Sequence, residues 1–376
     1  MSVIDERFCF IAEWYDPNAA LIRRYQFFYY PTDATTEMYD IKQRRIFLRR
    51  SPVENIRMQD LYIGSTISVM SRQLSLVEYG DDFTRRKVGA QKERTLALIK
   101  PDAVSKMGLI LDLIYKSGLL ITKMKMLKIS RTEAADFFTA YQGQDHYNDL
   151  INSISDGLMI AMELQGECTV SKWLELIGPG DSAVARHSNP LSLRARFGKD
   201  HTRNAVYGSE SQEKANEELE FFFPSSGACR PNPATYTECT CCVIKPHAVK
   251  AGVAGTIVNA ILEAGFEISA IAAYQMEKAN AQEFYEVYRG VVQEYSAMVD
   301  ELSLGPCIAM EIRAQNAPAT FREMAGPADP EIARHLRPRS LRAQFGIDKV
   351  RNAIHCTDLP EDAVLEVEYF FKILDH

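Results

Sequence analysis

The chain has 376 residues, which is enough for two or three domains of ordinary size. Its composition, 46% hydrophobic and 25% charged, is that of a protein able to bury hydrophobic cores, and its net charge of −7 does not favour wholesale electrostatic binding to nucleic acid. No apolar run approaches the ~20 residues that cross a bilayer, and the first residues lack the basic and apolar regions of a signal peptide. We therefore expect a cytoplasmic protein with no membrane partner.

Residues 1–91 form the first predicted domain. Aromatic and β-branched residues are dense here and are interrupted by Asp-Pro and Pro-Thr-Asp turns, a pattern that predicts an antiparallel β module. The first 90 residues carry 13 basic and 12 acidic side chains, so their net charge is opposite in sign to that of the whole chain. We interpret the grouped basic residues either as a solvated surface or as a docking surface for an acidic partner. They are Arg44, Arg45, Arg49, Arg50, Arg85, Arg86 and Lys87.

From residue 92 onward the sequence repeats itself. The segment at 96–104, LALIKPDAV, returns as CCVIKPHAV at 241–249, and RNAVYG at 203–208 returns as RNAIHC at 351–356. Between these motifs, GPGDSAVARHSNPLSLRARFG returns as GPADPEIARHLRPRSLRAQFG, and the offset rises only from 145 to 148 residues. A repeat of this length indicates a duplicated domain rather than a solenoid.

The repeat defines two copies, residues 92–223 and 239–376, joined by a linker rich in Pro, Ser and Gly at residues 224–238. Each copy shows a short apolar strand that ends in a Lys-Pro turn, an amphipathic helix that ends in glycine, a second strand, a capped helix, a third strand, further helices and a final strand. This order predicts an α+β fold with a ferredoxin-like βαββαβ core in each copy. Because a linker of about 15 residues gives the copies a high effective concentration for each other, we expect them to pair within one chain.

The eight cysteines are irregularly spaced, and the sequence contains no Asn-x-Ser/Thr site, so we expect free thiols in a reducing compartment. One cluster, CTCC at residues 239–242, has His247 nearby. Its spacing is not that of a C-x-x-C zinc motif, and no second pair of ligands follows. We interpret the cluster as small apolar residues that enter a strand, and we predict no metal site.

One difference between the copies has chemical consequences: Tyr207 in the first corresponds to His355 in the second. Histidine titrates near neutral pH and can act as a nucleophile, whereas tyrosine, with a pKa of about 10, does neither well. Asn352 lies three residues before His355, and Glu366 lies eleven residues after it in a run that reads as a strand. Such a carboxylate could fix which ring nitrogen keeps its proton.

The second copy also carries cations and a hydroxyl suited to phosphoryl transfer. Arginine and lysine would spread the charge of the transferred group while the histidine attacks in line. These residues are Lys245, Tyr288, Arg322 and Arg342. On composition alone, an ordinary turn histidine beside an asparagine stays an open alternative.

In their order and spacing these motifs resemble the nucleoside diphosphate kinase family. The resemblance rests on the IKPD(A/G)V strand end, the LR-x-x-FG segment and the N-x-x-H turn, and it covers about three-quarters of the chain. It implies a ping-pong exchange in which a nucleoside triphosphate phosphorylates the histidine and a diphosphate collects the group, with Mg²⁺ on the nucleotide phosphates. It implies that His355 is the phosphohistidine and Glu366 its supporting carboxylate. The implied nucleotide contacts are Lys245, Tyr288, Arg322 and Arg342 at the phosphates and Asn352 at the ribose.

The second copy departs from the family pattern at two positions. Ala328 replaces the phosphate-binding threonine, and Tyr295 is the nearest candidate for the aromatic residue that stacks on the base.

The first copy departs further. Tyr207 replaces the nucleophile, Leu174 stands where the second copy has Arg322, Gly180 replaces the threonine, and His146 lies near the base-stacking position. A phenol cannot form the phosphoramidate through which the exchange runs. We therefore expect a copy kept for packing or binding, with nucleotide binding there left open. The residues that it keeps are Lys100, Tyr141, Arg194, Asn204 and Glu218.

Two functions from different classes follow. The first is a microtubule-associated nucleoside diphosphate kinase-like protein in which only the second copy could transfer phosphate. The second is a catalytically weak or inactive structural scaffold of ciliary doublet microtubules. The N-terminal module resembles one found in flagellar and ciliary proteins, which implies tubulin and other axonemal or centrosomal proteins as partners. The implied location is the cytoskeleton, in the axoneme of a cilium or flagellum, the basal body or the centrosome. A nuclease ranks lower, because this acidic sequence shows no dedicated metal-carboxylate cluster.

Overall fold

The computed structural model describes residues 6–17, 19–53, 56–89, 93–227 and 230–375. The chain forms two compact units. The first comprises residues 1–92 and 275–305, and the second comprises residues 93–274 and 306–376. The second unit therefore holds all of the first copy that is described and most of the second copy.

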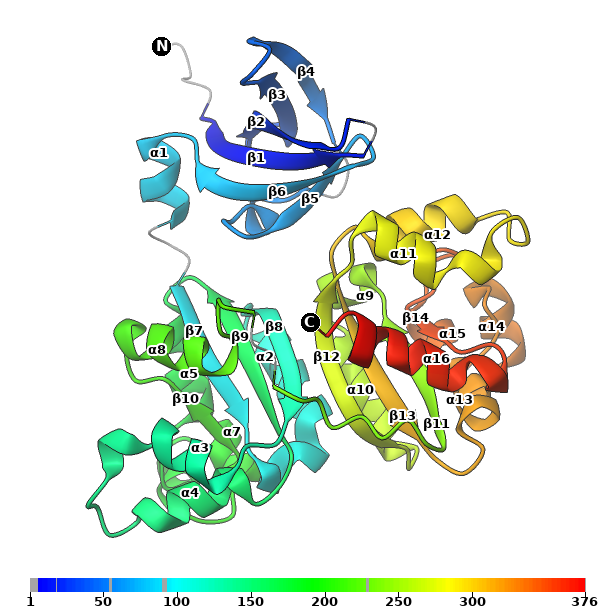
Figure 1. Ribbon diagram of the computed structural model, residues 1–376. Helices are drawn as coiled ribbons and strands as arrows, with labels where there is room; N and C mark the ends of the chain where they lie inside the picture. Colours follow the sequence, from blue (N-terminus) through cyan, green and yellow to red (C-terminus); the bar gives the residue numbers. More distant parts are fainter. Residues whose placement is uncertain (1–5, 18, 54–55, 90–92, 228–229, 376) are drawn as a thin grey trace. The chain divides into compact units, whose positions relative to one another are not determined.

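The N-terminal part of the first unit is an antiparallel sheet, as the sequence predicts. Over the described residues the sheet has six strands in the order β4-β3-β2-β1-β6-β5 (Figure 1). They are β1 (Phe8–Asp16), β2 (Leu21–Tyr30), β3 (Thr35–Asp40), β4 (Arg45–Pro52), β5 (Thr66–Val69) and β6 (Arg72–Tyr79). Alternate side chains of β1 and β2 enter one core, in which Phe10, Tyr25 and Phe27 are buried. The short helices α1 (Asp82–Thr84) and η2 (Arg85–Gly89) follow.

Two helices of the second copy belong to the first unit. They are α11 (Lys278–Phe284) and α12 (Tyr295–Leu302), and the short helix η5 (Glu286–Tyr288) lies between them. Gln73 of β6 holds both ends of this segment, because its Nε2 donates to Met276 O at 2.9 Å and to Ser303 O at 2.8 Å. Its Oε1 also accepts the N–H of Lys278 at 2.7 Å.

The second unit is built on a sheet of eight strands, counted over the residues that the structure describes, in the order β10-β7-β9-β8-β12-β13-β11-β14 (Figure 1). The first copy supplies β7 (Glu93–Ile99), β8 (Leu120–Leu127), β9 (Met159–Gly166) and β10 (Val206–Gly208). The second supplies β11 (Cys239–Ile244), β12 (Glu267–Gln275), β13 (Pro306–Arg313) and β14 (Ile354–Cys356). Each copy thus orders its strands fourth, first, third, second, which confirms the predicted ferredoxin-like core.

Helices connect these strands. In the first copy they are α2 (Met107–Lys116), α3 (Arg131–Phe137), α4 (Tyr147–Ser155), α5 (Thr169–Ile177), α6 (Ser182–Ser188), α7 (Leu193–Phe197) and α8 (Gln212–Phe222). In the second they are α9 (Pro246–Lys250), α10 (Ala254–Glu263), α13 (Ala317–Ala325), α14 (Pro330–Leu336), α15 (Leu341–Phe345) and α16 (Ala363–Glu368). The predicted capping is present in α3, where Ser130 and Glu133 form a reciprocal capping box, but it is wrong for α11 (Lys278–Phe284), whose N-cap residue, Glu277, makes no side-chain cap hydrogen bond.

The two copies pair within the chain, which confirms that expectation. Strands β8 and β12 are antiparallel neighbours, with Lys125 opposite Ala272, so one sheet runs through both copies. Helices α2 and α10 pack together at two glycines. A Cβ at Gly108 would lie 2.4 Å from the backbone nitrogen of Asn259, and one at Gly255 would lie 2.1 Å from that of Asp112. Only glycine allows so close an approach of the two backbones.

The described part of the linker bonds to both copies; Ala228 and Cys229 lie outside the described residues. Arg230 Nε pairs with Glu133 of the first copy at 3.1 Å. Asn232 Nδ2 donates to Asp375 Oδ2 at 2.7 Å, and the other oxygen of Asp375 accepts from Lys125 of β8 at 2.8 Å. The linker, the first copy and the end of the second copy therefore share one polar cluster.

One predicted element is wrong. The run around Glu366 is not a strand but the helix α16. Its buried residues are Ala363 and Val367, and Phe370 follows in η7 (Tyr369–Ile373), so buried positions recur at intervals of four and three, the spacing of a helical face. The equivalent run in the first copy is likewise helical, in α8. No helix in the described part of the chain is long and apolar enough to cross a membrane.

Candidate active site

His355 lies in the middle of β14, where it is opposite Val243 of β11 and only 5% exposed. Its Nε2 is 2.8 Å from Glu366 Oε2 of α16. The same carboxylate oxygen accepts from Thr357 Oγ1 at 2.8 Å. The strand therefore fixes the ring, and the helix supplies a carboxylate to Nε2, one of its two nitrogens.

The turn before β14 positions Asn352. Asn352 Nδ2 donates to Ala328 O at 2.9 Å, which links the turn to the loop that follows α13. Its Oδ1 is buried and has no hydrogen-bond partner among the residues that the structure describes. A buried amide oxygen without a partner is costly, and a hydroxyl group such as that of a ribose would satisfy it.

Two buried cations flank the histidine strand. Lys245, at the end of β11, donates from Nζ to Val350 O at 2.9 Å. Arg342 of α15 donates to Gly326 O at 2.9 Å and to Ile354 O at 3.3 Å, next to His355. Arg322 of α13 is exposed by contrast, and it bonds to the backbone carbonyl of Asp358. The structure thus brings His355 and Glu366 into contact and ties the cations to the same strand and its turns.

Tyr288 and Tyr295 belong to the other unit. Tyr288 lies in η5 with its ring 5.7 Å from that of Tyr285, and Tyr295 begins α12. Their roles beside the phosphates and the base stay predictions.

The first copy has the same frame around a phenol. Tyr207 Oη and Ser209 Oγ each donate to Glu218 at 2.6 Å. Burial, and after it the charge of Glu218, raises the pKa of Tyr207, so the phenol stays protonated. The rings of Phe137 and Phe138 pack edge-on against Tyr207 at 5.4 and 6.0 Å. The position of the nucleophile is therefore filled by a neutral side chain that is part of the core.

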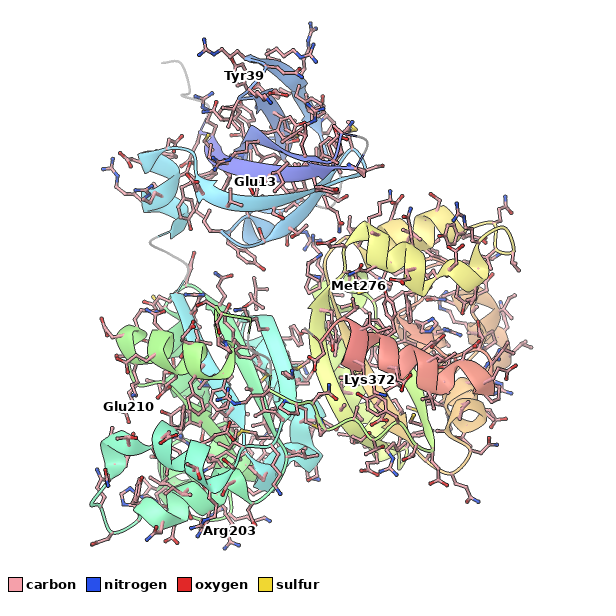
Figure 2. All side chains as sticks on the ribbon, viewed as in Figure 1. Glu13, Tyr39, Arg203, Glu210, Met276 and Lys372 are labelled. Carbon is pink, nitrogen blue, oxygen red and sulfur yellow. The ribbon has the colours of Figure 1, made fainter. Side chains whose placement is uncertain are left out.

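The retained polar residues of the first copy are engaged by the fold. Lys100 Nζ donates to Thr202 O and Asn204 Oδ1, and burial lowers its pKa to about 8. Arg194 donates to Gly178 O at 2.8 Å, and burial lowers its pKa to about 10. Glu210 (labelled in Figure 2) is the first copy's equivalent of Asp358. Leu174 offers it no cation, and it accepts a hydrogen bond from Tyr141 Oη at 3.2 Å.

Three contacts in the two copies are not predicted by the sequence. Thr357 donates to Glu366, and Ser209 donates to Glu218. The two residues hold equivalent positions in the repeat, which is the sequence signal for this contact. His247 was considered only as a zinc ligand, but its Nε2 accepts the N–H of Ala353 at 3.1 Å.

The cysteine cluster lies in β11, where its members are free thiols. Burial raises the pKa of Cys239 to about 12. Among the described residues no three His, Cys, Asp or Glu side chains are placed to hold a metal ion.

These features define a class: paired ferredoxin-like α+β domains, one of which carries a strand-borne histidine held by a carboxylate. Residues 93–227 and 238–375 match the family described as "Nucleoside diphosphate kinase", and residues 2–90 match "Nucleoside diphosphate kinase 7 N-terminal PH domain". The chain belongs to the nucleoside diphosphate kinase family. Members of this family bind nucleoside phosphates and generally use Mg²⁺ with them.

Several relatives are similar over much of the chain. "Nucleoside diphosphate kinase homolog 7" of Rattus norvegicus is 57% identical over 372 residues, which are 99% of this chain and 94% of the relative. The Mus musculus protein of the same name is 55% identical over the same shares of the two chains. "Thioredoxin domain-containing protein 3 homolog" of Heliocidaris crassispina is 34% identical over 74% of this chain and 32% of its own length.

Proposed function

We propose that the second copy transfers phosphoryl groups between nucleoside tri- and diphosphates through His355, and that the first copy does not. The observation that carries this proposal is the 2.8 Å contact between His355 Nε2 and Glu366 Oε2. The carboxylate keeps the proton of the neutral ring on Nε2, so the lone pair that would attack is the one on Nδ1.

The exchange has two half-reactions. In the first, Nδ1 attacks the γ-phosphorus, a nitrogen–phosphorus bond forms, and the bond from phosphorus to the bridging oxygen breaks with release of the diphosphate. In the second, a terminal oxygen of another diphosphate attacks the phosphohistidine and restores the imidazole. Lys245, Arg322 and Arg342 would offset the charge on the transferred group.

Mg²⁺ would supply further positive charge to the nucleotide phosphates. The residues present fit this arrangement, because Mg²⁺ is usually held by substrate phosphates and water with few protein carboxylates. The absence of a carboxylate cage among the described residues is therefore consistent with an ion that arrives on the nucleotide.

The test is phosphorylation of the full chain with γ-labelled ATP and Mg²⁺. We expect acid-labile label on His355 and none after His355→Ala. Tyr207→Phe is the matched control in the first copy and should leave the label unchanged. A His355→Ala variant that labels like the parent contradicts the assignment; a parent that never labels replaces it with the scaffold alternative.

We propose in addition that the N-terminal module attaches the protein to microtubules of the axoneme, basal body or centrosome. The supporting observation is a basic and apolar strip along β4, an edge strand of its sheet. Arg44, in the turn before β4, and Arg45 and Arg49 of β4 are exposed and have no ion-pair partner among the described residues, and Ile46 is 54% exposed. Arg50, by contrast, is engaged by Asp33 at 2.7 Å.

Charge alone does not distinguish docking from protection, since edge strands also use charged residues to prevent unwanted pairing. The exposed isoleucine and the single sign of charge between residues 41 and 52 favour docking on an acidic surface such as that of tubulin. The strip is tested by changing Arg44, Arg45 and Arg49 together to Glu and measuring co-sedimentation with microtubules.

The module offers a matched control. Changing Arg85, Arg86 and Lys87 of η2 to Glu alters the charge by the same amount elsewhere on the module. We expect the β4 variant to lose binding and the η2 variant to keep most of it. Equal losses would indicate a general charge effect, and full binding by the β4 variant would exclude the strip as the docking surface.

A further inference from the structure

The turn that carries the site contains a strained residue. Ala353, between Asn352 and His355, has a φ of +71°, and its equivalent in the first copy, Ala205, has a φ of +69°. Residues other than glycine keep a left-handed backbone only where their surroundings hold it. Something outside the turn must therefore fix Ala353, and with it the residues on either side.

Each alanine is held at both ends by the Lys-Pro strand end of its copy. The carbonyl of Ala205 accepts the N–H of Lys100 at 2.8 Å, and the carbonyl of Ala353 accepts the N–H of Lys245 at 2.9 Å. The alanine N–H donates to the second residue after that lysine. In the first copy the acceptor is Asp102 Oδ2 at 3.1 Å; in the second it is His247 Nε2, also at 3.1 Å.

The two acceptors differ chemically although they serve the same backbone N–H. A carboxylate accepts through either oxygen. An imidazole accepts at Nε2 only when its proton is on Nδ1, because the other tautomer would set one N–H against another. The second copy therefore depends on one tautomer of one histidine, and the first copy does not.

We propose that His247, as the Nδ1–H tautomer, is a positioning residue for the site of the second copy. It holds the N–H of Ala353 and through it the turn that presents Asn352 and leads into His355. Its action is indirect, and it touches no reacting atom. The kinetic consequence rests on the phosphotransfer function proposed above, whereas the hydrogen bond itself does not.

The kinetic test compares His247→Ala with His247→Asp, which introduces the acceptor that the first copy uses. We expect His247→Ala to slow nucleotide exchange about 10-fold or more, a size usual for residues that orient catalytic ligands, and to raise the KM for nucleotide because Asn352 loses its place. His247→Asp should restore most of both. Asp102→Ala removes the equivalent bond in the first copy and should leave both constants unchanged.

A structural readout tests the hydrogen bond even if the chain transfers no phosphate. In the full chain labelled with ¹⁵N-histidine and ¹⁵N-alanine, Nε2 of His247 should show the shift of an unprotonated nitrogen. The Ala353 amide resonance should move in His247→Ala and not in Asp102→Ala. A protonated Nε2, an unmoved Ala353 amide, or a failure of His247→Asp to restore what His247→Ala loses would each overturn the proposal. A parent that never exchanges phosphate while these signals behave as expected overturns only the proposed function.

Discussion

The two copies share a frame of hydrogen bonds that hold the turn and strand of the site, and they differ in the side chains that a ligand would contact there. In both, the buried lysine at the strand end donates to a carbonyl of the loop before the asparagine: Lys100 to Thr202 and Lys245 to Val350. In both, an arginine donates to the carbonyl of the residue that precedes the nucleophile position: Arg194 to Val206 and Arg342 to Ile354. These side chains hold the turn and the strand in place whether or not a nucleotide binds.

The differences fall on side chains with little part in that frame. Arg322 is exposed and bonds to the loop at Asp358, and in the first copy Leu174 replaces it. His355 and Tyr207 both reach the carboxylate of the following helix, so the fold accepts either residue. The structural hydrogen bonds of the lysine, the arginine and the asparagine are therefore enough to explain why the first copy retains them. Their retention gives no support for phosphotransfer there, because Tyr207 and Leu174 stand where the second copy has His355 and Arg322.

The largest test of this comparison is to revive the first copy. In a His355→Ala background, Tyr207→His places an imidazole beside the carboxylate of Glu218. Leu174, however, offers no cation at the position that Arg322 holds in the second copy. We expect Tyr207→His with Leu174→Arg to label about 10³-fold faster than Tyr207→His alone, the size usual for an arginine that spreads transition-state charge. Phosphohistidine formation in single-turnover assays measures it.

Two outcomes would change the account. Equal rates for the single and double variants would show that the arginine is not the missing group. No label in either variant would place the loss elsewhere, at Gly180 or at the base-stacking position near His146.

The next test concerns the carboxylates. Glu366→Gln should slow phosphorylation of His355 by about 10- to 100-fold. The amide oxygen can still accept a hydrogen bond from Nε2–H, but it stabilises the charged ring less than a carboxylate does. Glu218→Gln makes the same change in the first copy and should not alter the rate. Equal rates for Glu366→Gln and the parent would show that Thr357 and the strand suffice to orient the ring.

A smaller effect tests the pairing of the copies. Gly255→Ala puts a Cβ 2.1 Å from the backbone nitrogen of Asp112, so α2 and α10 must move apart. We expect a loss of about 1–3 kcal/mol in the free energy of unfolding, as for other overpacked sites. Gly180→Ala is the control, because a Cβ there meets nothing within 4 Å. Denaturant titration of the three proteins would refute the pairing account if both variants match the parent.

Much of the fold was readable because the repeat presents each element twice. The strand end before Lys100 reappears before Lys245, and the glycines that end the predicted helices bound α2 and α10 closely. The run around Glu366 was misread, since short aromatic and β-branched runs fit a strand as well as one face of a helix. His355 and its carboxylate were found because the two copies differ at one and agree at the other.

The role of His247 could not be read in the same way. Its partner, Ala353, is 106 residues away, and the bond exists only because the Lys-Pro strand end and the asparagine turn meet in the sheet. The sequence shows a histidine where the first copy has Asp102, but not that both residues face the same backbone N–H. Contacts of this kind depend on tertiary structure, as does the fastening of the linker at Asp375.

The smallest expected effect concerns Lys100, whose pKa burial lowers from 10.5 to about 8. Below pH 8 the lysine is charged in both states, and its burial costs stability. Between pH 8 and 10.5 the unfolded chain binds more protons than the folded chain at this residue, so stability should rise with pH, by at most about 1.4 kcal/mol per pH unit. Lys100→Met removes this dependence. The measurement is the free energy of unfolding of parent and variant at pH 7.5 and 10, and the parent should gain relative to the variant. A difference that stays constant or falls would show that the pKa of Lys100 is not lowered in the folded chain, because its charge is solvated or compensated there.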